Sequence, residues 1–299
     1  MPLEKSIPEA SEAGGIRAVG PRVPSVGVAI GAESHVGKVR DGNEDQFLVA
    51  QLAKSIRIWK TSLDGDSTRF SDEEGYLMIV ADGMGGASAG EHASALAVRT
   101  VEDFMLDALK WFHHLPGHEE HALLGELRQA LEDADREVIR RARAEPGLRG
   151  MGTTLTMAYS VGVDLYLVHA GDSRAYLFRE GKLDRMTSDH TLVQALVDGG
   201  ALTPEAARVH PRRNVVTNVI GGPRPGVHAE IHKADIRDGD VVLLCTDGLT
   251  GPVSDAEIAR MLAEHDAPDD AARALVEAAL AGGAPDNVTV VVARYRTDG

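Results

Sequence analysis

Aspartate residues stand at the ends of short apolar runs in five places along this 299-residue sequence. The run Tyr76–Ala81, for example, ends in Asp82, which is followed by three glycines among the next four residues. Apolar runs this short, bounded by turn residues, are typical of buried β-strands. A single Asp-Gly pair indicates only a turn. Five together predict carboxylates gathered at one edge of a sheet, and these are Asp45, Asp82, Asp172, Asp247 and Asp286.

Carboxylates placed in this way repel one another, and a bound divalent cation relieves that repulsion. The ligands are oxygens, without Cys/His pairs at zinc spacing nearby, so Mg²⁺ or Mn²⁺ is favoured over Zn²⁺. Hard cations held like this typically serve phosphoryl chemistry. Arg40, five residues before Asp45, is either a bidentate clamp for a phosphate or an ordinary surface arginine.

Short strands and one-sided helices must position these acids. The strands are expected at Val26–Ala32, Gln46–Ala50, Tyr76–Ala81, Thr153–Ser160, Asp164–Ala170, Ser173–Arg179, Val227–Lys233, Asp240–Cys245 and Val288–Arg294. The helices are expected at Ser88–Met105, about Glu119–Ala144, Ser254–Ala263 and Pro268–Ala281. Strands beside strands and helices in pairs, without repeated βαβ units, indicate an α+β fold.

Three of the expected strands follow one another closely. The connections Val161–Gly162 and Gly171–Asp172 between them are very short, which favours an antiparallel meander. Ile56–Trp59 is read as a strand or hairpin and Asp64–Asp72 as a polar loop. Ser188–Gly222, with two short helices and the basic stretch His210–Arg213, is expected to leave the sheet and cover a site.

The overall composition limits the kinds of partner. Lys+Arg 31 against Asp+Glu 46 gives a net charge of −15, which argues against nucleic acid and anionic membranes and favours cations. The single cysteine excludes an intrachain disulfide. Without a membrane-spanning stretch or a signal peptide, we expect a cytoplasmic protein. Residues 1–24 are read as a flexible tail and 25–297 as one domain.

Six motifs occur in the order and approximate spacing of the metal-dependent protein phosphatases, the type 2C Ser/Thr phosphatases. They are RDGNED (Arg40–Asp45), ADGMGG (Ala81–Gly86), GTT (Gly152–Thr154), GDSR (Gly171–Arg174), CTDGL (Cys245–Leu249) and DN (Asp286–Asn287). The sequence resembles a bacterial-type member of this family from about Val26 to Arg296, nearly the whole chain outside the tail.

The resemblance implies a four-layer α-β-β-α sandwich of two antiparallel sheets flanked by helix pairs. It also implies two Mn²⁺ or Mg²⁺ ions, with Asp82 between them and the Gly83 carbonyl on one. By position, Asp247 and Asp286 would complete the shell of the first ion. Asp45 would hold metal-bound waters, with Glu44 beside it and Asn287 next to Asp286.

Three further positions acquire a role from the same resemblance. Arg40 would bind the substrate phosphate, Asp172 with Asp247 would take a weaker third ion, and about 188–222 would form a flap. Met84 departs from many eukaryotic members, which have a histidine proposed as general acid there. A thioether donates no proton, so the leaving group must be protonated by metal-bound water or another residue.

The implied activity is hydrolysis of phosphoserine and phosphothreonine by direct attack of metal-activated water. The partners would be phosphorylated proteins, among them Ser/Thr kinases and their substrates, and we expect a monomer. Two alternatives stay open: a catalytically silent binding module, and a hydrolase of small phosphate esters.

Other features are expected to carry no chemistry. Cys245 lies in an apolar run and lacks the arginine that a cysteine phosphatase loop requires. The histidines 113, 114, 118 and 121 are read as a solvated connection between helices. Asp64-Gly65-Asp66 lacks the glycine of a calcium loop, since Arg69 occupies that place.

Overall fold

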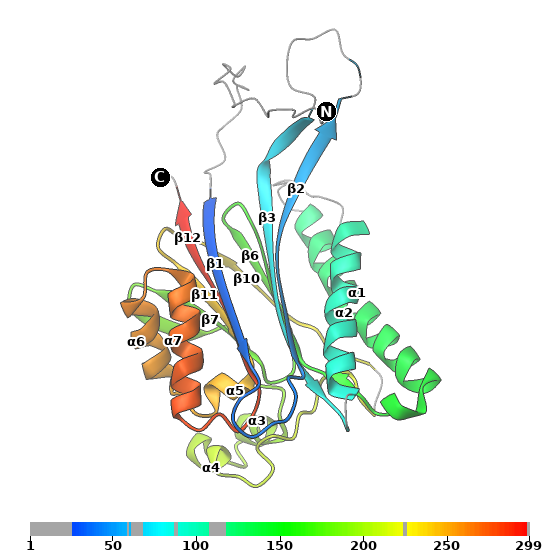
Figure 1. Cartoon of the computed structure of the whole chain (residues 1–299), viewed down its shortest axis with the longest axis vertical. Helices are drawn as coiled ribbons and strands as arrows, with labels where there is room; N and C mark the ends of the chain where they lie inside the picture. Colours follow the sequence, from blue (N-terminus) through cyan, green and yellow to red (C-terminus); the bar gives the residue numbers. More distant parts are fainter. Residues whose placement is uncertain are drawn as a thin grey trace, which may run out of the picture.

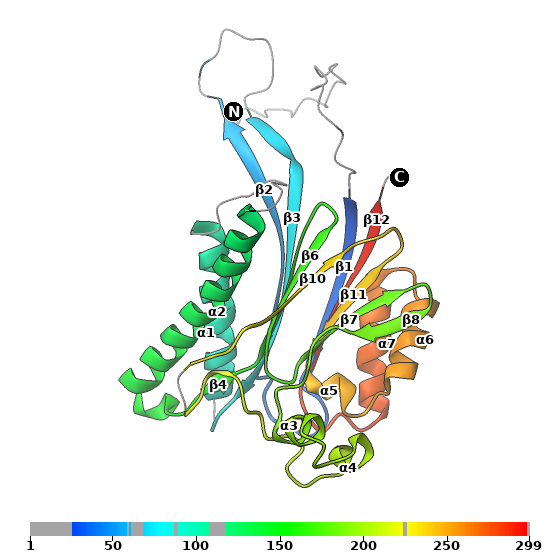
Figure 2. The ribbon, with the colours of Figure 1, turned by 180° about the vertical axis from the view of Figure 1, so that it is seen from behind.

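Two antiparallel sheets lie face to face, each with helices on its outer side (Figure 1). The computed structural model describes residues 26–58, 60, 68–86, 89–107, 118–223 and 226–297. Within these ranges the layers follow the predicted α-β-β-α order, which Figure 2 shows from behind. The predicted α+β class is confirmed.

The first sheet has five strands in the order β1-β12-β11-β7-β8. These are β1 (Val26–His35), β7 (Arg174–Arg179), β8 (Lys182–Arg185), β11 (Val241–Cys245) and β12 (Val288–Thr297). Every residue of β11 is buried, as expected of a continuous apolar run that is covered on both faces.

The second sheet has seven strands in the order β10-β6-β5-β3-β4-β9, with β2 paired to β3. Its strands are β2 (Asp45–Arg57), β3 (Thr68–Met84), β4 (Gly152–Thr153), β5 (Leu155–Val161), β6 (Asp164–Ala170), β9 (Ile220–Gly221) and β10 (Glu230–Asp235). The hairpin β2–β3 is longer than predicted, because Thr68–Asp72 continues the strand where a polar loop was expected. β10 starts at Glu230 rather than Val227.

Each sheet is covered by its own helices. Helices α1 (Ala89–Asp107) and α2 (His118–Ala144) pack on the second sheet, and α6 (Asp255–Glu264) and α7 (Pro268–Ala281) on the first. The predicted capping box that starts α6 is present, since Ser254 and Glu257 bond each other's backbone N–H groups. The shorter elements are η1 (Pro146–Leu148), α3 (Leu192–Asp198), α4 (Pro204–Arg208) and α5 (Asp247–Thr250).

A third apolar cluster lies between the sheets and fixes one against the other. It includes Met78 and Val80 of β3, and Leu244 and Val291 of the first sheet, all fully buried. Side chains of this size each contribute roughly 1.5–3 kcal/mol when buried. Tyr295 of β12 adds a hydrogen bond to Ser160 of β5 at 3.1 Å across the layer.

The predicted meander is wrong at its third strand. Strands β5 and β6 pair antiparallel as expected, but β7 pairs with β11 and β8 in the other sheet. The chain crosses between the layers at Gly171, whose φ of +125° is open to glycine. A Cβ there would also lie 2.4 Å from that of Thr154. The crossing leaves Asp172 between the two sheets rather than in a hairpin turn.

Some sequence-based expectations fall outside the described residues. These include residues 1–24, the Asp64–Asp66 stretch, His113 and His114. His118 and His121 belong to the first turn of α2 rather than to a connection. None of the helices in the described part of the chain combines the length and apolarity needed to cross a bilayer.

Candidate metal centre

The five strand-end aspartates interact at one edge of the two sheets. Asp45 begins β2, Asp82 lies near the end of β3, and Asp247 begins α5, separated from the end of β11 by one residue. Asp286 precedes β12, and Asp172 lies in the crossing from β6 to β7. These strand ends gather around α5 at the lower end of Figure 1. Asp82 is repelled by all four of the other acids, so the sequence-predicted group is brought together.

Register and a threonine hold the two central acids. Asp45 and Asp82 are direct partners in the β2–β3 ladder, so their side chains leave the same face of the sheet. Thr246 donates a hydrogen bond to Asp45 Oδ2 at 2.9 Å and accepts one from the Thr289 N–H at 3.0 Å. The hydroxyl therefore joins the first sheet to an acid of the second.

The crowded carboxylates are held as weak acids. Burial, with repulsion from Asp247 and Asp286, raises the pKa of Asp45 to about 7 even though Thr289 and Thr246 donate to it. Burial and the charge of Asp247 raise the pKa of Asp172 to about 7. Burial and neighbouring carboxylates also raise the pKa values of Asp82 and Asp247. A positive charge among these groups would remove most of the repulsion.

Among the described residues, two of the buried oxygens that lack any hydrogen-bond partner belong to these acids. They are Asp45 Oδ1 and Asp247 Oδ1, and buried carboxylate oxygens are rarely left without a donor. The candidate metal ligands at this edge are all carboxylate or carbonyl oxygens, which suit Mg²⁺ or Mn²⁺ better than Zn²⁺. The residues present therefore fit a hard divalent cation.

Asn287 organises the loop before β2. Its Nδ2 donates to the carbonyls of Val36 and Gly42 at 2.8 and 2.9 Å, and its Oδ1 accepts from the Glu44 N–H at 2.8 Å. Burial raises the pKa of Glu44. Asn287 thus acts here by holding the backbone that carries Glu44 and Asp45.

Arg40 points into the group of acids. Its Nη2 donates to Asp286 Oδ2 at 2.7 Å, with half of the Arg40 side chain exposed. This hydrogen bond, together with the charges of Asp286, Glu44 and Asp82, raises the pKa of Arg40 despite some burial. The guanidinium is thus placed beside the carboxylates and remains open to solvent.

The GTT motif fixes the backbone of Asp82. The Asp82 N–H donates to Thr154 Oγ1 at 2.9 Å, while Thr154 N–H and Thr153 Oγ1 donate to the Asp82 carbonyl at 2.9 and 2.8 Å. Thr154 Oγ1 also lies 2.8 Å from Ser173 Oγ, next to Asp172. These two threonines and Thr246 are support residues that sequence reasoning did not single out individually. The signal that could have found them is a threonine at or just after the end of a strand.

Gly83 is required by a close approach of chains. A Cβ at this position would lie 2.2 Å from the Gly90 carbonyl oxygen in α1. The Gly83 N–H donates to the Glu44 carbonyl at 3.2 Å. The glycine therefore lets β3, α1 and the Glu44 loop meet beside the acids.

A cavity of about 890 Å³ opens beside the acids. The first part of Ser188–Gly222, with α3 and α4, forms one wall, and α5 with the start of α6 forms another. Asp172 and Asp247 lie on its lining, and so do Arg208 and Arg213 of the Ser188–Gly222 segment. The segment predicted as a flap thus borders a space large enough for part of a peptide.

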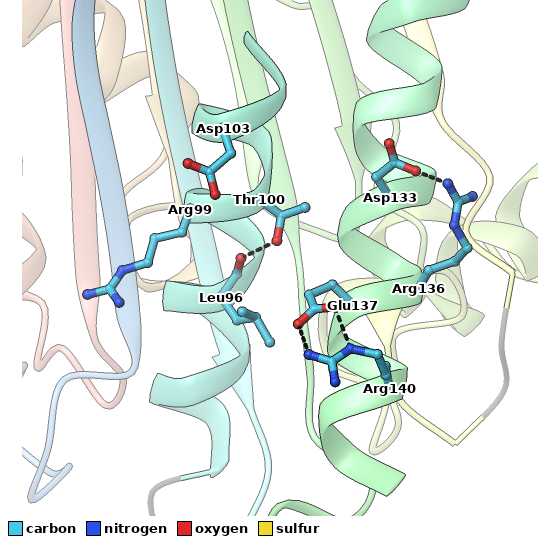
Figure 3. Close-up of a pocket in the computed structure, with 8 residues that line it drawn as sticks. All are labelled: Leu96, Arg99, Thr100, Asp103, Asp133, Arg136, Glu137 and Arg140. Atoms are coloured by element: carbon cyan, nitrogen blue, oxygen red, sulfur yellow. Dashed lines mark hydrogen bonds and ion pairs between the residues drawn. The ribbon is translucent and has the colours of Figure 1, made fainter. Parts of the chain in front are cut away.

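Two other features are not part of this site. Cys245 is fully buried in β11, and burial raises its pKa to about 12, in keeping with a packing role. A hollow of about 520 Å³ lies between α1 and α2 on the outer side of the second sheet (Figure 3). The charged side chains that α2 contributes pair with one another, Arg136 with Asp133 and Arg140 with Glu137.

The chain resembles known proteins in family, sequence and structure. The family model described as "Protein phosphatase 2C" matches residues 58–281. The serine/threonine protein phosphatase PstP of Mycobacterium tuberculosis is 43% identical over 217 residues, which are 73% of this chain and 40% of that protein. The chain thus spans well under half the length of PstP. The serine/threonine phosphatase stp of Listeria monocytogenes is 34% identical over 216 residues, 72% of this chain and 83% of that protein.

Solved structures agree with these matches. The crystal structure of M. tuberculosis PstP/Ppp superimposes with a TM-score of 0.71 at 38% identity, covering 89% of this chain and 98% of the other. A structure of the PstP catalytic domain in complex with two manganese ions also gives 0.71, at 36% identity, covering 91% and 100%. The chain belongs to the protein phosphatase 2C family.

Proposed function

We propose that this protein is a metal-dependent phosphatase that hydrolyses phosphoserine and phosphothreonine in proteins. The observation that carries the proposal is the cluster of five aspartates with two buried, unpartnered oxygens. A catalytically silent binding module would have no need to keep such mutually repelling groups together, since their repulsion destabilises the fold. The relatives named as Ser/Thr phosphatases support the same activity.

The proposed ligands of two Mn²⁺ or Mg²⁺ ions are Asp82, the Gly83 carbonyl, Asp247 and Asp286. Asp45, beside Asp82, would hold metal-bound waters. Asp172 and Asp247 would hold a weaker third ion. The two manganese ions of the PstP catalytic domain support this stoichiometry. Residues 25–297 would form the catalytic domain and about 188–222 its flap.

The bound ions would activate water for in-line attack on phosphorus. Arg40 would bind the phosphate oxygens, exchanging its contact with Asp286 for the substrate. Thr246 orients Asp45, and Thr153 with Thr154 holds the backbone of Asp82, so the carboxylates need little rearrangement. Met84 has no proton to give, so proton transfer to the leaving serine or threonine falls to water or a residue of the flap.

We further propose that the substrates are phosphorylated proteins, including Ser/Thr kinases and their targets, reached by a monomer in the cytoplasm. The net charge of −15 argues against nucleic acid and anionic membranes as partners. Cleavage of small phosphate esters would use the same site and is a measurable alternative.

The test is phosphate release from matched phosphothreonine and phosphotyrosine peptides, with Mn²⁺ and then with chelator. We expect release from phosphothreonine in Mn²⁺, little from phosphotyrosine, and none after chelation. Asp82→Asn should abolish turnover while the circular dichroism spectrum stays unchanged. Substantial activity of Asp82→Asn in Mn²⁺ would refute the assigned site, and equal turnover of p-nitrophenyl phosphate and peptide would favour the ester hydrolase.

A further inference from the structure

The residue in front of Asp172 is held from both sides by one histidine. His190 Nδ1 accepts a hydrogen bond from the Gly171 N–H at 3.1 Å, and the His190 N–H donates to the Gly171 carbonyl at 2.7 Å. Gly171 is the point where the chain crosses between the sheets. The histidine therefore fastens the start of the Ser188–Gly222 segment to this crossing.

The residue before His190 holds the other side of Asp172. Asp189 accepts two hydrogen bonds from Arg174, at 2.8 and 2.7 Å, in a bidentate pair. Both side chains are mostly buried, 14% and 21% exposed, so the pair is shielded from solvent. Asp172 is thus bracketed by Gly171 and Arg174, which are gripped by two consecutive residues of the segment.

The protonation of the His190 ring follows from its neighbours. Gly171 N–H and Asn218 Nδ2, at 2.9 Å, both donate to Nδ1, so that atom carries no proton. The proton is on Nε2, which donates to Glu230 Oε2 at 2.9 Å. The Nδ1 side of the ring therefore holds Gly171, and the hydrogen bond from Nε2 to Glu230 orients the ring.

Glu230 is itself fixed in the second sheet. It is the register partner of His169 in β6, and its Oε1 accepts from the Ser188 N–H at 3.1 Å and from His232. Although burial opposes it, hydrogen bonds from His190 and His232 lower the pKa of Glu230 to about 2. One possible metal-ligand atom from each of His169, His190 and Glu230 lies within 4.8 Å of the other two. Their hydrogen bonds already use the ring nitrogens, so the group fits an anchor better than a metal site.

We propose that His190, oriented by Glu230, is a positioning residue that fixes Asp172 beside Asp247 and sets the flap wall of the cavity. The inference rests on the proposed function for its chemical meaning. Neither His190 nor Glu230 contacts Asp172 or Asp247 directly. Its effect passes through the backbone of Gly171.

Two substitutions separate the two sides of the ring. His190→Asn places an acceptor near the former Nδ1 and keeps the bond from the Gly171 N–H. His190→Gln places a donor near the former Nε2 and keeps the bond to Glu230, but it loses the bond from the Gly171 N–H, while the backbone bond to the Gly171 carbonyl remains. The matched control is His228→Ala, because His228 is exposed and its contacts with Asn218 are made by the backbone.

The first readout is amide hydrogen exchange at Gly171 in the full chain, measured without metal. We expect exchange roughly tenfold faster in His190→Gln, the effect of losing one such bond, and little change in His190→Asn or His228→Ala. Equal rates in His190→Gln and the unaltered protein, or equal acceleration by Gln and Asn, would overturn the proposal. Because this readout needs no turnover, it decides the inference even if the proposed activity is absent.

The second readout is Mn²⁺ binding by calorimetry, together with kcat and KM for a phosphothreonine peptide. In His190→Gln we expect Mn²⁺ affinity or kcat to fall by about 10- to 100-fold, as for other residues that orient metal ligands. His190→Asn should stay within about threefold of the unaltered protein. Glu230→Gln, which should loosen the ring without removing it, serves as a second variant if His190→Gln fails to fold. Unchanged Mn²⁺ binding and kinetics in a folded His190→Gln or Glu230→Gln would count against positioning. Failure of the unaltered protein to release phosphate would instead refute the proposed function.

Discussion

Asp45→Asn should stabilise the metal-free protein while weakening its hold on Mn²⁺. In the fold, Asp45 is 4% exposed and one carboxylate oxygen has no partner among the described residues. Asparagine keeps the size of the side chain and an acceptor for the Thr246 hydroxyl. It also removes a charge that Asp247 and Asp286 repel.

The size of the effect follows from the pKa of Asp45. Its rise from 3.8 to about 7 corresponds to about 4 kcal/mol of free energy at pH 8. Because the folded state binds this proton more tightly than the unfolded chain, metal-free stability should fall as the pH rises from about 4 to about 7. Because asparagine does not titrate, the variant does not lose this stability as the pH rises. The gain should therefore approach a few kcal/mol at pH 8 and vanish near pH 4.

Urea unfolding at pH 8 and pH 4.5, in EDTA and in saturating Mn²⁺, measures all of these quantities. In EDTA at pH 8 the variant should unfold at higher urea, and in Mn²⁺ the order should reverse because a bound ion stabilises only the folded state. Asp240→Asn is the control, since Asp240 is equally buried but accepts two hydrogen bonds from Arg179. It should destabilise with or without metal. A loss of stability for Asp45→Asn in EDTA at pH 8 would refute the reasoning.

Three further predictions concern the neighbours of the acids. Thr246→Val leaves the buried Thr289 N–H without its acceptor, so urea unfolding should show a loss of about 1–3 kcal/mol; no loss would mean that water replaces the hydroxyl. Arg40→Ala removes a half-exposed side chain, so the melting temperature should hardly change while KM for a phosphopeptide rises about tenfold; an unchanged KM would argue against the phosphate contact. Cys245, fully buried and with its pKa raised to about 12, should resist iodoacetamide at pH 8 by mass spectrometry; rapid alkylation of the folded protein would contradict the packing.

Much of the site could be predicted from the sequence because its donors lie at the ends of regular elements. A strand end is visible as an apolar run that stops, so Asp82, Asp247 and Asp286 are marked by local pattern alone. The convergence of their side chains depends on register, however. That Asp45 opposes Asp82 follows from the ladder, which local sequence does not show.

The crossing at Gly171 could not be predicted in this way. A two-residue connection between apolar runs is the usual sign of a hairpin, and only tertiary packing sends β7 to the other sheet. The support residues were hidden for a related reason. Thr246 and His190 act through Thr289 and Gly171, which lie 43 and 19 residues away in the chain, and no periodicity reports such contacts.

The pairing of β1 with β12 along ten residues places the first and last described strands side by side within one sheet. During synthesis on the ribosome, the first strand must therefore wait for almost the whole domain before its partner emerges. Contacts this distant in sequence slow folding, because the chain must close a long loop before they form. Asp286 arrives only two residues before β12, so a partly made chain lacks a full set of acids. We expect the emerging domain to gain metal affinity only after β12 has left the exit tunnel.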